Sequence, residues 1–161
     1  MENACHDSSL RRHLTALLTG GGAHTTFTDA IKDFPVEHAG VRPKGSPHSA
    51  WDLLEHLRIA QADILRFSYS RDYVELKWPD DYWPASHAPA SAREWETSVA
   101  AIRAELGKFS EIVNDEGRDL FEPFPWGKGQ TLLREALVLA DHNSWHLGQL
   151  MLIRRMIESQ H

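Results

Sequence analysis

Cysteine and long apolar runs are the two features that the sequence most clearly lacks. Cys5 is the single cysteine among 161 residues, which excludes an intrachain disulfide. No apolar run approaches the ~18–20 residues that a membrane span needs, and the N-terminal stretch MENACHDSSLRRH lacks the apolar centre of a signal peptide. We therefore expect a cytoplasmic protein in a reducing compartment, with no membrane partner.

Basic charge is also scarce. Lysine and arginine number 17 against 23 acidic residues, for a formal net charge of −6. Because binding to phosphates needs a basic face, a nucleic-acid partner is not expected. The sequence has no glycine-rich phosphate loop after a strand and no G-x-S-x-G motif, so phosphate transfer and serine hydrolysis lack support.

What the sequence does contain is helical periodicity. Apolar residues recur three to four positions apart in four long segments, and Gly/Pro-rich stretches separate them. The first segment is expected in two pieces, broken at Gly20-Gly21-Gly22. The predicted segments are 8–18 with 23–34, 49–68, 91–117 and 131–157. They predict an all-α four-helix bundle in a single domain, 1–161, with its core at about 8–158.

The connection over 69–90 shows neither a helical nor a strand period. It carries five aromatic residues, namely Tyr69, Tyr73, Trp78, Tyr82 and Trp83. Connections of this length are uncommon in small domains unless they pack down or serve function. We therefore expect this loop to pack over the bundle.

Two histidines interrupt the apolar stripe of the fourth segment. His142 and His146 are four residues apart, so both imidazoles leave the same face of a helix and can reach one metal ion. The same step occurs in H-E-x-x-H metalloproteases, but Asn143 stands here in place of the catalytic glutamate, which sets that activity aside. The alternative for this pair is two hydrogen-bonded histidines in or near the core.

A third histidine on another predicted helix makes the metal hypothesis more specific. His56 lies among core leucines of the second segment, and its alternative is a half-buried histidine paired with Asp52. Three neutral imidazoles suit zinc, nickel or a similar divalent ion and leave coordination positions open to water or substrate. Carboxylates commonly hold the other ring nitrogens, and the nearby candidates are Asp52, Glu55 and Asp141.

The other histidines are interpreted as ordinary surface residues. His24 is expected to cap a helix at the surface, and its alternative is a position in the wall of the pocket. Solvated positions in tails, loops or exposed faces are expected for His6, His13, His38, His48, His87 and His161.

The two histidine-bearing segments resemble the DinB-like (damage-inducible) superfamily of small bacterial proteins. The resemblance rests on His-Ser-Ala-Trp-Asp-Leu-Leu-Glu-His-Leu at 48–57 and on Asp-His-Asn-Ser-Trp-His-Leu-Gly-Gln-Leu at 141–150. These are similar to the family's W-x-L-L-x-H-L and H-x-x-x-H-x-G-Q segments. Their separation and their place in a four-helix chain also match, so the resemblance spans about residues 10–158.

This resemblance implies a bundle of up-down-down-up topology, a metal site at His56, His142 and His146, and frequent homodimerisation. It also implies chemistry related to thiol-dependent S-transferases and a maleylpyruvate isomerase, with a low-molecular-weight thiol as a possible cofactor. Three hypotheses follow. The protein is a metal-dependent transferase or hydrolase acting on a small electrophile, a non-catalytic stress-related module with a structural or vestigial metal site, or a metal-free bundle whose histidines are satisfied within the core.

Overall fold

Every regular element in the computed structural model, which describes residues 2–20 and 22–159, is a helix. The four long helices are α1 (Glu2–Thr19), α3 (Ala50–Tyr69), α4 (Ala92–Asn114) and α5 (Leu132–Glu158). The short helix α2 (Phe27–Ile31) and the 3-10 turns η1 (Val36–His38) and η2 (Asp80–Tyr82) complete the set. The all-α prediction is confirmed.

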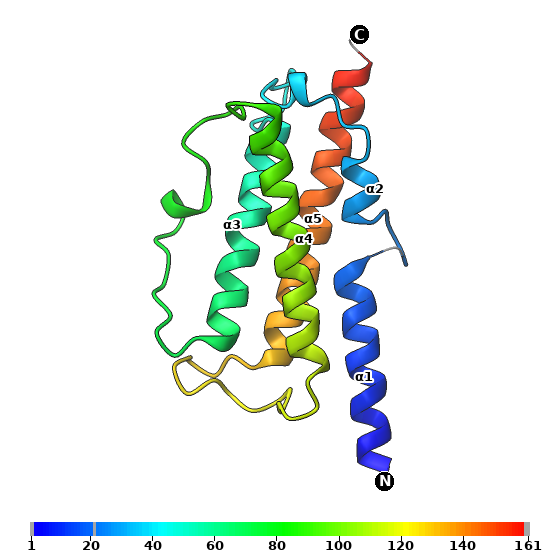
Figure 1. Ribbon diagram of the computed structural model, residues 1–161, viewed down its shortest axis with the longest axis vertical. Helices are drawn as coiled ribbons and strands as arrows, with labels where there is room; N and C mark the ends of the chain where they lie inside the picture. Colours follow the sequence, from blue (N-terminus) through cyan, green and yellow to red (C-terminus); the bar gives the residue numbers. More distant parts are fainter. Residues whose placement is uncertain (1, 21, 160–161) are drawn as a thin grey trace.

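The helices run up, down, down and up, as Figure 1 shows. Helices α1 and α2 ascend one edge, α3 descends, a long loop climbs back, α4 descends, and α5 ascends. Helix α3 packs against α4 and α5, and α1 packs against the same two helices. Helices α1 and α3 therefore occupy opposite corners of the bundle.

Local side-chain caps fix where three of the long helices begin. The Ser49, Ser91 and Thr131 side chains each accept a hydrogen bond from the backbone amide three residues later. In α3 the Asp52 carboxylate also accepts from the Ser49 amide, which completes a capping box. These contacts satisfy amides that have no partner within the helix. The predicted starts are therefore correct to within one residue.

The predicted boundaries differ from the structure at three places. Helix α1 begins at Glu2, six residues before the predicted start. The segment 23–34 is helical only over the five residues of α2, and Asp33 then takes a left-handed φ of 53°. Helix α4 ends at Asn114, before the predicted stop. The predicted break after α1 is present at Gly20, whose φ is 76°; Gly21 lies outside the described residues.

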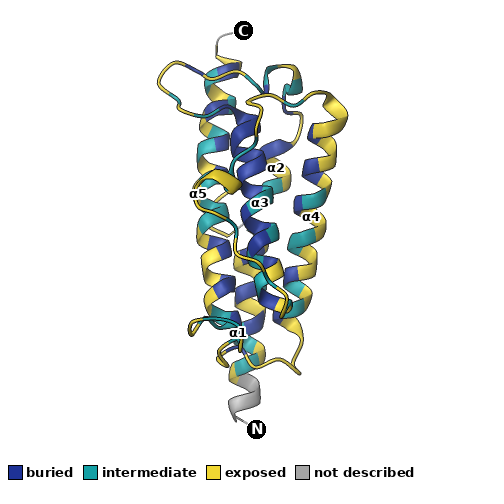
Figure 2. Ribbon diagram, turned by 90° about the vertical axis from the view of Figure 1, so that its left-hand side faces the viewer, coloured by how far each residue is buried: buried dark blue, intermediate teal, exposed yellow. Residues whose placement is uncertain are grey.

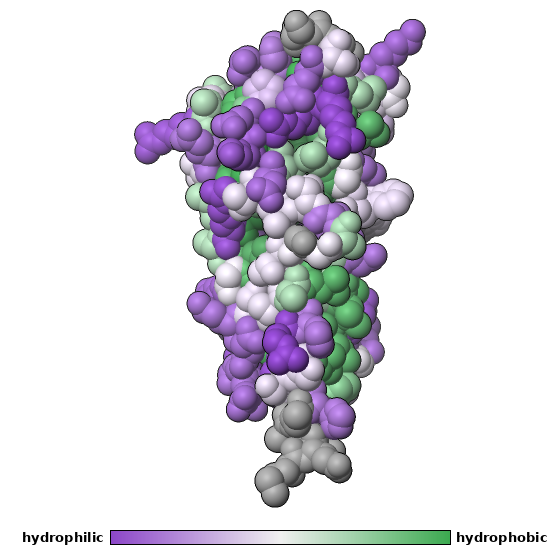
Figure 3. Space-filling model, turned by 90° about the vertical axis from the view of Figure 1, so that its right-hand side faces the viewer, coloured by the Kyte–Doolittle hydropathy of each residue, from purple (hydrophilic) through white to green (hydrophobic). Residues whose placement is uncertain are grey.

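Helix α3 is the most buried element, and the 70–90 loop crosses in front of it (Figure 2). The predicted apolar stripes of α4 and α5 face inward, with Trp95, Phe109, Leu139 and Leu150 all buried. Figure 3 shows apolar side chains gathered in the lower half of the face on which α1 lies. None of the helices in the described part is long and apolar enough to cross a membrane.

Candidate metal centre

Helices α3 and α5 bring three histidines together in the middle of the bundle. One ring nitrogen each from His56, His142 and His146 lies within 4.8 Å of the others. His56 is buried, whereas His142 and His146 are half-buried. The geometry therefore forms the predicted cluster, and this cluster could hold a metal ion.

The outer nitrogens of two of these rings face oxygen acceptors. His56 Nδ1 lies 2.8 Å from the backbone carbonyl oxygen of Tyr82, to which only a protonated nitrogen can donate. His146 Nδ1 lies 3.1 Å from Oε1 of Gln149, one turn further along α5. With the proton on Nδ1, the Nε2 lone pair of each ring remains available for a metal ion.

The third ring is linked to α3 through two amide side chains. Asn143 Oδ1 lies 3.4 Å from His142 Nδ1, a weak contact. Asn143 Nδ2 donates to Gln61 Oε1 at 3.2 Å, and Gln61 Nε2 donates to the Ile102 carbonyl at 2.8 Å. Gln61 is fully buried, so this chain of amides fixes Asn143 between the two helices.

The expectation that carboxylates support the histidines is wrong. The partners are a backbone carbonyl and two side-chain amides, none of which carries charge. Glu55 instead forms an ion pair with Arg58 on its own helix. Neutral acceptors fix the tautomer but add no negative charge to the site.

Burial holds all three imidazoles in the neutral form that metal binding requires. Burial lowers the pKa of His56 and of His142 below the usual value. The pKa of His146 falls to about 4, mainly through burial and further through the positive charge that His142 and His56 would carry. At neutral pH the cluster therefore presents uncharged nitrogen donors.

The spacing of the donors suits a first-row divalent ion. Nε2 of His56 and Nε2 of His142 lie 3.1 Å apart. Two nitrogens bound tetrahedrally to one zinc ion at about 2.0–2.1 Å stand roughly 3.3–3.4 Å apart. This pair thus fits the group that the resemblance implies, the third donor lies within 4.8 Å of both, and three protein ligands would leave positions open.

The aromatic loop packs over the bundle, as predicted, and two of its residues lie against this cluster. The Trp83 ring stacks on His56 at a centroid distance of 4.1 Å and on His48 at 4.3 Å, nearly parallel to both. The solvated interpretation of His48 is therefore wrong, because this ring is one of two that enclose the indole. Tyr82 and Trp83 together fix the tautomer of His56 and cover one face of its ring.

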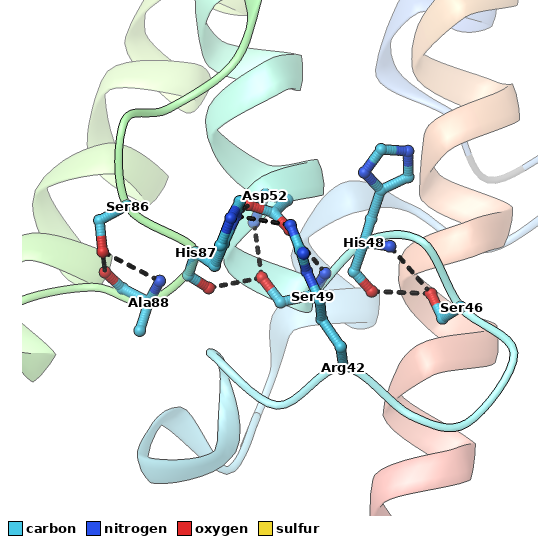
Figure 4. Close-up of polar contacts among 8 residues, drawn as sticks. All are labelled: Arg42, Ser46, His48, Ser49, Asp52, Ser86, His87 and Ala88. Atoms are coloured by element: carbon cyan, nitrogen blue, oxygen red, sulfur yellow. Dashed lines mark hydrogen bonds and ion pairs between the residues drawn. The ribbon is translucent and has the colours of Figure 1, made fainter.

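Asp52 organises the loops at the start of α3 rather than pairing with His56 (Figure 4). Its buried carboxylate accepts from Arg42 at 3.0 Å and contacts His87 Nδ1 at 2.9 Å. The Ser49 hydroxyl donates to the His87 carbonyl at 2.6 Å. His87 is exposed, as expected, but its ring also contacts Asp52, a partner 35 residues away that sequence spacing could not reveal.

His24 is exposed, as expected, but it does not cap a helix. Thr26 caps α2, and His24 Nε2 lies 2.9 Å from the Ser144 hydroxyl on α5. His6 and His13 are exposed in α1. His161 lies outside the described residues.

Comparisons with protein-family models, with curated proteins and with solved structures found no match for this chain. The structure independently bears out the coarser content of the resemblance, which is a small all-helical protein with a three-histidine cluster.

Proposed function

We propose that His56, His142 and His146 bind one divalent metal ion, zinc or nickel, and that the protein is a DinB-like metal-dependent enzyme acting on a small electrophile. The reaction class is transfer to a low-molecular-weight thiol or hydrolysis by water. One observation carries the proposal. Ring nitrogens of three neutral imidazoles lie within 4.8 Å of one another, and the Nδ1 atoms of two of these rings face an oxygen acceptor.

The residues around the cluster have different roles in such a site. When bound, the ion would lower the pKa of a water molecule or thiol that it coordinates. Trp83 excludes solvent from the His56 side of the cluster. His142 and His146 are half-buried, so a small substrate would approach along their side. Asn143, which stands where a metalloprotease has its general base, is held by Gln61, and its carboxamide cannot act as a base at neutral pH.

The test is metal content per chain, measured on tag-free protein purified without chelator and again after adding divalent ions. We expect close to one ion per chain, and loss of binding in His146→Ala. His13→Ala removes an exposed histidine far from the cluster in sequence and should keep the metal. Full metal content in His146→Ala, or no metal uptake by the wild-type protein, would overturn the proposal.

The same geometry supports a second candidate, a binding module without catalysis. The 3.1 Å separation of the His56 and His142 Nε2 atoms is also a hydrogen-bond distance if one of the two carries a proton. Trp83 already covers part of the cluster. A fourth protein ligand in the metal-loaded protein would favour a structural site, whereas an exchangeable water would favour the enzyme. The homodimer and the thiol cofactor stay predictions.

A further inference from the structure

A second cavity lies along the same two helices, two turns from the histidine cluster. Asp63 follows His56 by seven residues on α3, and Glu135 precedes His142 by seven residues on α5. Seven helical residues rise about 10 Å. The two carboxylates therefore lie on the same two helices as His56 and His142, about 10 Å further down the bundle. Asp63 and Glu135 line a cavity of about 470 Å³, a volume suited to a small molecule.

Asp63 is a buried carboxylate whose hydrogen bonding is incomplete. The residue is 7% exposed. Oδ2 accepts from the Tyr82 hydroxyl at 2.7 Å and from the Tyr73 hydroxyl at 3.3 Å. Oδ1 is buried and has no hydrogen-bond partner among the described residues, and no arginine or lysine of that set forms an ion pair with Asp63. A buried carboxylate oxygen without a donor is costly unless something else supplies one.

Glu135 adds a second buried carboxylate to the cavity wall. Burial raises its pKa, and the negative charge of Asp63 raises it further, against the opposing effect of Arg134. Arg134 pairs with Glu135, and Lys128 is exposed at the rim. Neither cation therefore neutralises Asp63.

Aromatic rings make up much of the remaining wall. Phe67, Tyr73, Tyr82 and Trp126 all line the cavity. The Phe67 ring meets Tyr73 edge to face at 5.0 Å, and the Trp126 indole N–H donates to the Phe67 carbonyl at 2.8 Å, which fixes the indole. Aromatic faces beside a desolvated carboxylate favour cations, because the ring quadrupole attracts positive charge.

From these contacts we propose that this cavity binds a small organic cation, a primary ammonium or guanidinium, whose N–H groups donate to Asp63. This site is separate from the metal centre and goes beyond the function proposed for it. The cation displaces the Tyr73 hydroxyl from Asp63, because this hydrogen bond is the longer of the two and Tyr73 lies on the loop after α3. Tyr82 stays in place, since its carbonyl also holds His56.

The first test compares n-butylammonium with n-butanol, using calorimetric titration of metal-free, full-length protein at neutral pH. The two probes share an apolar chain and differ in charge. We expect the ammonium to bind at least ten times more tightly than the alcohol. Equal affinity for the two, or no heat of binding for either, would overturn the proposal, and this result does not depend on whether the histidines bind metal.

The second test uses matched charge changes. Asp63→Asn keeps the shape and both tyrosine contacts but removes the charge, and we expect at least a tenfold weaker affinity for n-butylammonium. Asp72→Asn removes one exposed carboxylate from the same loop and should change the affinity less than twofold. Equal weakening in both variants would show a general charge effect and overturn the site. Circular dichroism of both variants checks the fold, and the comparison of probes on the wild type stands even if Asp63→Asn does not fold.

Discussion

The Nε2 atoms of His56 and His142 lie 3.1 Å apart, although the two residues stand 86 positions apart in the chain. Without a metal ion, one nitrogen must donate and the other accept, because two facing lone pairs repel. The carbonyl of Tyr82 holds the Nδ1 proton of His56, so a neutral His56 is the acceptor and His142 carries its proton on Nε2. Its Nδ1 is then unprotonated and forms no hydrogen bond with the Asn143 Oδ1 atom, which lies 3.4 Å away.

Metal binding should therefore move one proton on His142. We expect ¹⁵N spectra of the metal-free protein to show His142 protonated on Nε2 and His56 on Nδ1. Adding one equivalent of zinc should shift the His142 proton to Nδ1 and leave the tautomer of His56 unchanged. Identical His142 spectra before and after zinc addition would mean that this ring is not a ligand.

The lowered histidine pKa values also predict how the metal-free protein responds to acid. An unfolded histidine titrates near pH 6.5, while His146 in the fold titrates at about 4 and the pKa values of His56 and His142 are lowered as well. Between these values the unfolded chain binds more protons than the folded one. The free energy of unfolding is therefore highest above pH 6.5 and falls as the pH drops toward 4.

The measurement is the urea midpoint of metal-free protein from pH 7.5 to 4.5. His146→Gln removes one titrating group and should flatten the decline. A decline of the same size in this variant would contradict the assignment.

Asp52 affects stability at lower pH than the histidines do, because the hydrogen bonds from Ser49, His87 and Arg42 outweigh burial and lower its pKa. Its contribution is lost only below the ordinary aspartate range.

Local features of the fold could be predicted from the sequence, and non-local ones could not. Helix starts could be predicted at Ser49, Ser91 and Thr131, because a capping side chain bonds an amide only three residues away in the sequence. The His142–His146 pair is likewise a property of one helix. By contrast, the partner of His56 is a backbone carbonyl at Tyr82, which any residue could supply. Trp83, which lies in the loop between α3 and α4, stacks on His56, and the spacing of residues in the sequence does not predict such a contact.

Gln149 supports the metal site through His146 alone. Gln149→Leu removes the acceptor for His146 Nδ1, so the ring is free to rotate or change tautomer. We expect metal affinity to fall about 10–100-fold, the usual effect of losing such a partner. Gln149→Glu keeps an acceptor and should retain or raise the affinity. Competition with a chromogenic chelator measures both variants, and an unchanged affinity in Gln149→Leu would contradict this role.

Arg11 ties the end of α4 to α1 and should be a major contributor to stability. The residue is 4% exposed, and its guanidinium donates to the carbonyls of Val113 at 2.7 Å, Asp115 at 3.0 Å and Arg118 at 2.6 Å. The carbonyls of Val113 and Asp115 lie at the C-terminal end of α4, where a cation is favourable. Without Arg11 the Val113 oxygen would be left buried without this donor.

We therefore expect Arg11→Met, which keeps the apolar bulk, to lower the free energy of unfolding by about 2–3 kcal/mol. For a chain of this length the melting temperature should fall by roughly 5–10 °C. Arg12→Met is the matched control, because Arg12 is exposed and its one hydrogen bond within the described part of the chain goes to the Ser9 hydroxyl, at 3.2 Å. It should change stability by no more than about 0.5 kcal/mol. Equal effects of the two substitutions in thermal unfolding would show that the carbonyl contacts of Arg11 contribute nothing beyond a general charge effect.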